Sequence, residues 1–200
     1  MSPACIAGIV TWLCMEDPLS KELAKEAEAK AAAGGGGGGS GDGYSGRGGH
    51  SEDVAGAILV FLPGTQEIRD VEKALTEGPF REILGGAALV LQLHGSLSME
   101  DQNKVFQRPP AGKRKVVLAT NVAESSVTID DVAYVVNSGK LKERRFNSAT
   151  AVSSLQTHWA SAANNKQRRG RAGRVRPGLC INLYVQKKDQ FIDLECARGH

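Results

Sequence analysis

Apolar side chains in this chain gather into short runs with little polar alternation. The runs are rich in Val, Ile and Leu, a pattern typical of strands that are buried on both faces of a parallel sheet. They predict strands over the following ranges: Ala57–Leu62, Ala87–Leu93, Val116–Ala119, Val132–Val136 and Leu179–Tyr184.

Helical patterns lie between several of these runs. Thr65–Thr76 places three apolar residues on one face: Ile68, Val71 and Leu75. Ser98–Gln107 opens with a capping serine and two acidic residues, and we expect Val105 and Phe106 to point inward. Trp159–Arg174 is a third candidate helix. Alternating strands and helices predict an α/β fold, a parallel sheet with flanking helices.

The first fifty residues differ from the rest in composition. Residues 1–16 are mildly apolar and match no single pattern. Asp17-Pro18 then marks a helix start, and the Ala-, Lys- and Glu-rich residues 18–33 form the predicted helix. Residues 34–49 contain eleven glycines and predict a flexible tether. We therefore expect a flexible N-terminal segment, an α/β domain and a frayed tail, over residues 1–52, 53–186 and 187–200.

Positive charge is concentrated in one part of the chain. The net charge is only +3, but residues 144–188 carry ten Lys and Arg and no Asp or Glu. Such a block is expected near phosphate groups, and a solvated basic face remains the alternative.

Cysteine spacing and hydropathy argue against two other classes of protein. The four cysteines are widely spaced without a C-x-x-C pair, so we expect no metal site. The apolar stretch Ala4–Cys14 is too short to span a membrane. We expect a soluble intracellular chain, nuclear or cytoplasmic, without a membrane partner.

Polar residues follow two of the predicted strands. Pro63-Gly64-Thr65 joins a strand to a helix, and 120–131 is dense in hydroxyls, amide and carboxylate groups. Strand ends of this kind carry the ligand groups of open α/β sheets. An ordinary joint and a capped turn are the structural alternatives.

A third polar segment is the run Gln167-Arg168-Arg169-Gly170-Arg171-Ala172-Gly173-Arg174. The spacing of Gln167, Arg171 and Arg174 predicts that all three share one helix face. Arginine suits phosphate because its charge is permanent and its planar fork matches phosphate oxygens. The run therefore predicts a clamp for the γ-phosphate of a nucleotide, with a basic surface helix as the alternative.

The amino-acid sequences of these segments, and their order along the chain, resemble those of one protein family. The motifs FLPG-x-x-E-I, LHGSL, ATN-x-AE-S-S-x-TIDDV and QRRGRAGR resemble the C-terminal lobe of DEAH/RHA-type ATP-dependent RNA helicases. The resemblance spans about residues 56–185 and implies a RecA-like fold. It also implies that ATP closes two lobes on RNA, with hydrolysis reopening them.

Family resemblance also implies roles for single residues. RNA backbone contacts fall on five residues: Gly64, Thr65, Thr120, Asn121 and Thr128. ATP contacts fall on Ser126, which senses the nucleotide state, on Asp130, which holds the ribose, and on Phe106, which stacks on adenine. Catalytic contacts to the γ-phosphate fall on Gln167 and on the arginine fingers Arg171 and Arg174.

The chain departs from the family pattern in several places. Asn137 replaces a usual aspartate, and Phe146-Asn147 replaces a usual Tyr-Asp pair. No G-x-x-x-x-G-K-[ST] loop or D-E-x-H stretch is present; in the family these hold the ATP phosphates and Mg²⁺. We therefore expect the lobe to need a first helicase lobe as its partner, and the isolated chain to show negligible ATPase. The alternative is a stand-alone, non-enzymatic RNA-binding or regulatory module.

Overall fold

The computed structural model describes most of the chain outside the glycine tract. The described residues are 2–33, 56–125, 128–147, 152–174, 177–184 and 194–197.

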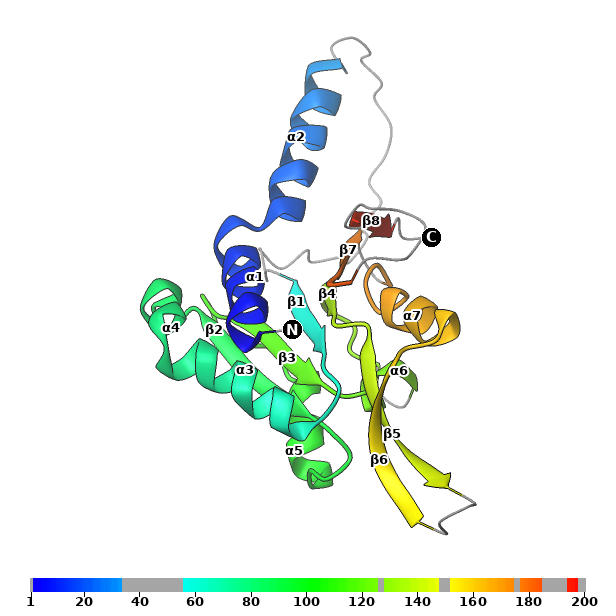
Figure 1. The fold of residues 1–200 in the computed structure, drawn as a ribbon. Helices are drawn as coiled ribbons and strands as arrows, with labels where there is room; N and C mark the ends of the chain where they lie inside the picture. Colours follow the sequence, from blue (N-terminus) through cyan, green and yellow to red (C-terminus); the bar gives the residue numbers. More distant parts are fainter. Residues whose placement is uncertain are drawn as a thin grey trace.

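A predominantly parallel sheet forms the centre of the fold (Figure 1). Within the described residues it has six strands in the order β2-β3-β1-β4-β7-β8, of which only β8 is antiparallel to its neighbour. This confirms the predicted α/β class. The bounds are β1 Ala57–Phe61, β2 Ala88–Leu93, β3 Arg114–Ala119, β4 Val132–Asn137, β7 Gly178–Asn182 and β8 Leu194–Ala197.

Two apolar cores lie on opposite faces of this sheet, because successive side chains of a strand point to opposite sides. One core packs Ile58, Val60 and their neighbours against the helices α1 (Pro3–Glu16), α3 (Thr65–Glu77) and α4 (Pro79–Leu84). On the other face, Leu59 and Phe61 pack against shorter segments. These segments include the 3₁₀ helix η1 (Lys104–Phe106), α6 (Val122–Ser125), Ile129 and Ala172.

Helix α1 corrects the expectation that residues 1–52 form a flexible segment. Ile6, Val10 and Leu13 recur at helical spacing and are buried in the core beside α3. The expectation failed because Gly8 interrupts the apolar pattern. In the structure, Gly8 faces the ring of Phe80 on α4, where a small residue allows close helix packing.

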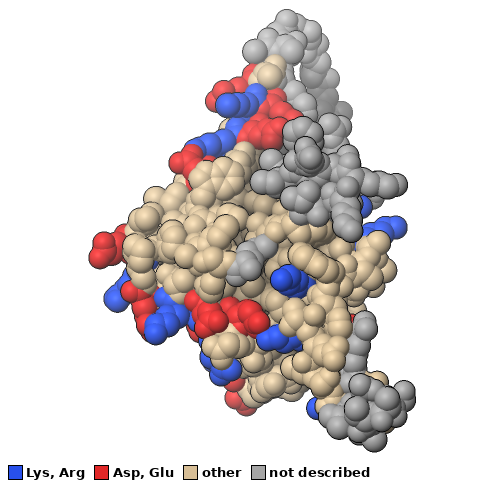
Figure 2. Space-filling model, in the orientation of Figure 1, with Lys and Arg blue, Asp and Glu red and all other residues tan. Residues whose placement is uncertain are grey.

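Side-chain contacts hold the junction of α1 with α2 (Pro18–Ala33) against the sheet. Asp17 has a left-handed backbone (φ 37°) and accepts a hydrogen bond from the hydroxyl of Tyr134 on β4. Arg114, at the start of β3, forms an ion pair with Asp17 at 3.0 Å. Helix α2 matches the predicted range and projects from the body, carrying a mixture of acidic and basic side chains (Figures 1 and 2).

A hairpin of β5 (Lys140–Asn147) and β6 (Val152–Trp159) extends beyond the sheet (Figure 1). The sequence analysis missed both strands because their residues are mostly polar or basic and form no apolar run. The tail was also expected to be frayed, yet Leu194–Ala197 forms β8 by pairing with β7.

Two predicted helices are shorter than expected. The helix expected over Trp159–Arg174 spans only α7 (Ala162–Arg169). The helix expected over Ser98–Gln107 consists of α5 (Met99–Asn103) followed by η1. Val105 is buried as predicted, but the side chain of Phe106 is 50% exposed, so its inward placement was wrong. Two consecutive residues on a single 3₁₀ turn point in different directions, so only one of them faces the core.

Candidate functional site

The end of α7 (Ala162–Arg169) sets the geometry of the arginine segment. Its start is fixed by a capping box between Ser161 and Asn164, and Gly170 ends it. Arg171 and Arg174 therefore lie in the turn after the helix, and the prediction that they share a helix face with Gln167 was wrong. Gly173 has a positive φ of 80°, which turns the chain back towards β7.

The two candidate finger arginines have different surroundings. Arg171 is only 9% exposed, and its guanidinium donates to the backbone oxygen of Glu124 in α6. Burial, and then the nearby charge of Arg174, lower the pKa of Arg171. Arg174 is exposed and donates through Nη1 to Oγ1 of Thr128 at 3.1 Å. The structure thus brings the arginine turn against the segment that follows α6, whereas Gln167 is exposed on α7.

Arg168 is a buried residue that the sequence analysis did not single out. Its side chain is fully buried and forms an ion pair with Glu124, with Nη2–Oε1 and Nε–Oε1 distances of 2.7 and 2.8 Å. The guanidinium also lies 5.0 Å from the ring centroid of Phe61. Asn164 of α7 donates to the second carboxylate oxygen of Glu124 at 2.7 Å. A carboxylate in α6 and a cation in α7 therefore hold these two elements together.

Asn137, the departure noted in the sequence, belongs to the same buried cluster. Its Oδ1 accepts from Arg168 at 2.9 Å and from the backbone N–H of Gly139 at 2.9 Å. Its Nδ2 donates to the side-chain oxygens of Asn165 and Asn182, each at 3.0 Å. A carboxylate has no proton to donate in its ionised form, so the amide makes bonds that aspartate at this position could not make.

Residues of the 120–131 segment fall into two groups. Thr120 is buried at the end of β3, and its backbone N–H donates to Leu93. Asn121, Thr128 and Asp130 are exposed. Ser126, the predicted nucleotide sensor, lies outside the described residues.

At the carboxyl end of β1, the Pro63-Gly64-Thr65 turn meets the hairpin. Gly64 is buried, and a Cβ built on it would lie 2.9 Å from the Cδ of Lys142. Lys142 donates to both carboxylate oxygens of Glu67, at 2.8 and 2.9 Å. The structure therefore brings the two predicted RNA contacts, Gly64 and Thr65, beside β5.

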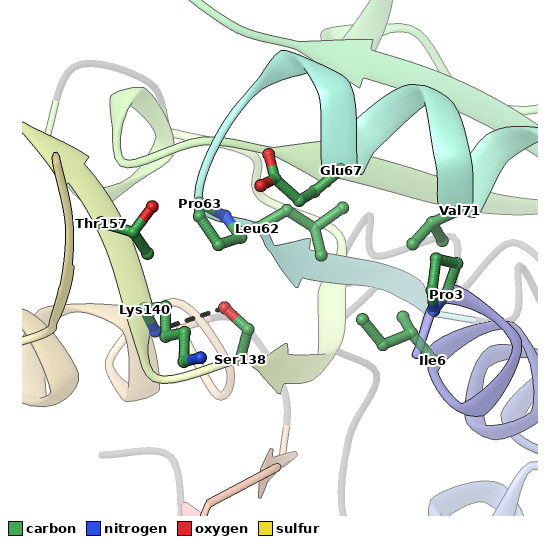
Figure 3. A pocket seen from close by; sticks show the side chains of 9 residues that line it. All are labelled: Pro3, Ile6, Leu62, Pro63, Glu67, Val71, Ser138, Lys140 and Thr157. Carbon is green, nitrogen blue, oxygen red and sulfur yellow. Dashed lines mark hydrogen bonds between the residues drawn. The ribbon is translucent and has the colours of Figure 1, made fainter. Parts of the chain in front are cut away.

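A pocket of about 160 Å³ lies next to this turn (Figure 3). The side chains of Leu62 and Val71 form an apolar part of its lining. Polar groups come from Glu67 on α3 and from Lys140 and Thr157 on the two strands of the hairpin. The pocket thus lies between the base of the hairpin and the α1–α3 layer.

One face of the hairpin combines basic and apolar side chains. Alternation places residues 140, 142, 144 and 146 of β5 on the same face, opposite residues 159, 157, 155 and 153 of β6. Phe146, Leu155 and Trp159 are each more than 60% exposed, and the ammonium of Lys140 lies 5.0 Å from the Trp159 ring centroid. Cations beside exposed rings suit nucleic-acid phosphates and bases.

The described residues contain no group of three His, Cys, Asp or Glu that could hold a metal ion. Across the same part of the chain, no helix is long and apolar enough to cross a membrane.

Comparison with known proteins identifies this arrangement. The family model named "Helicase conserved C-terminal domain" matches residues 50–176. The chain belongs to this family. DExH-box ATP-dependent RNA helicase DExH6 of Arabidopsis thaliana is 53% identical over 137 residues, which cover 68% of this chain and 10% of the relative. Human putative ATP-dependent RNA helicase DHX57 is 47% identical over 131 residues, covering 65% of this chain and 10% of that protein.

A solved structure gives the same result. The E. coli DEAH/RHA helicase HrpB is 37% identical with a TM-score of 0.60, and the match covers 72% of this chain and 17% of that chain. The helicase domain described here is therefore the C-terminal domain of the DEAH/RHA type, as its motifs predict. The chain spans about a tenth of the length of the curated relatives it matches.

Proposed function

We propose that this helicase domain works as the second lobe of an ATP-dependent RNA helicase. It binds the RNA backbone and supplies arginine fingers to ATP that a first lobe holds. The observation that carries the proposal is the arginine turn, because Arg171 donates to Glu124 in α6 and Arg174 donates to Thr128, which lies two residues before Asp130.

The electrostatics of this turn favour an anionic ligand. Arg171 keeps a positive charge in a partly buried position beside a second cation, and both effects lower its pKa. An anion placed between the two guanidinium groups would offset the desolvation and the repulsion together. We assign the γ-phosphate of ATP to this position, the ribose to Asp130 and the adenine to Phe106. Mg²⁺ and the remaining phosphates belong to the first lobe.

RNA is assigned to the carboxyl edge of the sheet and to the basic face of the hairpin. Gly64, Thr65, Thr120, Asn121 and Thr128 supply backbone amide or hydroxyl groups for phosphate and ribose oxygens. Lys140 and Arg144 add charge, while Phe146 and Trp159 add exposed rings on which bases can stack. Recognition through backbone and stacking contacts is largely independent of base sequence.

Fluorescence anisotropy with a labelled twelve-nucleotide oligo(U) tests the RNA assignment in the 200-residue chain. Arg144→Glu on the hairpin should weaken binding roughly tenfold, because a phosphate contact is replaced by repulsion. Lys73→Glu on α3, an equal change of charge outside the hairpin, is the matched control and should change affinity far less. Equal losses in the two variants would show that the hairpin has no special role.

The alternative is a non-enzymatic RNA-binding module. Exposed rings on the basic hairpin favour RNA binding under either view, so anisotropy alone does not separate them. The arginine turn does, since a binding module has no need of Arg171. If RNA binds but Arg171→Ala leaves ATP hydrolysis unchanged in a two-lobe protein, the binding module becomes the better account.

A further inference from the structure

Lys115 on β3 is a buried cation that the proposed function does not yet use. Its side chain is 1% exposed. Strand alternation places it on the same sheet face as Val117 and Ala119, the face that carries η1 and Ile129. A buried ammonium persists only when its donors find acceptors, so the partners of Lys115 indicate what it does.

Three acceptors surround its Nζ, and an ammonium has three N–H groups to donate. The backbone oxygens of Val105 and Gln107 lie at 2.7 and 3.0 Å, and Oδ2 of Asp131 lies at 2.9 Å. The first two come from the segment around η1, and the third comes from the loop that leads into β4. A single nitrogen therefore joins two segments that are far apart in the sequence.

In each of these two segments, a residue next to a partner of Lys115 is a proposed adenosine contact. Val105 and Gln107 flank Phe106, whose ring stays exposed while the carbonyls on both sides bond to Lys115. Asp131 follows Asp130, which is exposed. Holding the two carbonyls and the Asp131 carboxylate around one nitrogen constrains the distance between the backbone at Phe106 and the backbone at Asp130.

Ala57 lies on the strand between Lys115 and the segment of Asp131. Ile58 pairs with Val116, so Ala57 and Lys115 stand one residue earlier on neighbouring strands. On its other side Ala57 pairs with Val132, and its N–H donates to the backbone oxygen of Asp131 at 2.8 Å. Ala57 belongs to the same apolar core as Val117, so the residue at this position on the Lys115 face of the sheet is small.

We propose that Lys115 is a positioning residue that holds the adenine-stacking ring and the ribose-binding carboxylate at the spacing of one adenosine. The inference rests on the proposed function, since it takes Phe106 and Asp130 as the contacts. Lys115 itself touches neither group of the ligand and acts through Val105, Gln107 and Asp131.

Nuclear magnetic resonance titrations of the 200-residue chain with AMP and with adenine test the proposal. In the unmodified chain, AMP should shift the amide resonances of Phe106 and Asp130 together. Asp131→Asn keeps an oxygen for Lys115 but removes the charge, so AMP affinity should fall about threefold while adenine affinity stays unchanged. Lys115→Met should lower AMP affinity further, and Lys113→Met, at an exposed lysine of the same segment, is the matched control.

The comparison of AMP with adenine separates positioning from a general structural role. Equal losses for the two ligands in Asp131→Asn would mean that the fold was damaged, and unchanged AMP affinity would mean that the connection has no effect; either result overturns the proposal. If Lys115→Met does not fold, the AMP and adenine affinities of Asp131→Asn alone decide the result. An unmodified chain in which AMP shifts neither Phe106 nor Asp130 would refute the nucleotide assignment itself, and the inference with it.

Discussion

At the scale of single residues, a buried cluster of one cation, one carboxylate and several amides connects the arginine turn to the sheet. Arg168 and Glu124 supply the two charges, and Asn137 supplies both donors and acceptors. Burial makes each of these groups expensive to leave without a partner. The cluster therefore holds α7 against α6 and β4, and with it the turn that carries Arg171.

Replacing Arg168 by Met should destabilise the domain by about 3–5 kcal/mol, because Glu124 would be left buried without its cation. The free energy of unfolding, measured by urea titration, checks this. Lys166→Met, at an exposed position of the same helix, should change it by about 0.5 kcal/mol or less. A loss below about 1 kcal/mol for Arg168→Met would contradict the role given to the pair.

Asn137→Asp should also destabilise the domain, by about 1–3 kcal/mol, because it removes two hydrogen-bond donors and adds a second carboxylate beside one arginine. Asn182 already bonds to Asn137, so a cation introduced by Asn182→Arg would lie beside the new carboxylate and balance its charge. The double variant Asn137→Asp/Asn182→Arg should recover part of the loss in the same urea titration. A single variant more stable than the parent would refute this interpretation of the departure.

At the scale of elements, helix α1 gives a direct test of the packed N-terminal region. Cys5 is exposed, whereas burial raises the pKa of Cys14 to about 11. At pH 8 the Cys14 thiol therefore stays protonated and poorly reactive, and it becomes a thiolate only as the pH rises towards 11.

Iodoacetamide at pH 8 should consequently label Cys5 quickly and Cys14 slowly, as peptide mass spectrometry would show. Urea-unfolded chain, in which both thiols react at similar rates, is the control. Equal labelling of Cys5 and Cys14 in the folded chain would mean that α1 is not packed against α3.

Strands and helices differed in how far the sequence predicted them. The central strands were found because their apolar runs are buried on both faces, and Ile68, Val71 and Leu75 defined α3 by spacing alone. The hairpin carries its side chains into solvent, so it leaves no apolar run to detect. The end of α7 was missed because spacing arguments assume a continuous helix, whereas Gly170 ends this one.

The site was predicted less completely than the fold. The motifs led to Arg171, Arg174 and residues of the 120–131 segment; in the structure Arg174 bonds to Thr128, and Arg171 bonds to Glu124 in the same segment. Arg168 and Lys115 were missed because burial of a charged side chain depends on distant partners, such as Glu124 and Asp131, which no local pattern reveals.

At the scale of the whole molecule, the proposed function requires two lobes. We propose that this helicase domain supplies the arginine turn and an RNA-binding hairpin, and that the first lobe supplies the phosphate-binding loop and Mg²⁺. We therefore expect the purified 200-residue chain to hydrolyse ATP at background rate with and without RNA. A phosphate-release assay checks this expectation. RNA-stimulated hydrolysis that Arg171→Ala abolishes would contradict it.

The most direct measurement is RNA-stimulated ATP hydrolysis by a two-lobe fusion, with the first lobe of a DExH-box relative joined ahead of this chain. We expect hydrolysis in the fusion and a loss of at least about 10³-fold with Arg171→Ala. Lys73→Ala, far from the turn on α3, should leave the rate unchanged. An Arg171→Ala fusion as active as its parent would contradict the proposal that this lobe supplies an arginine to ATP.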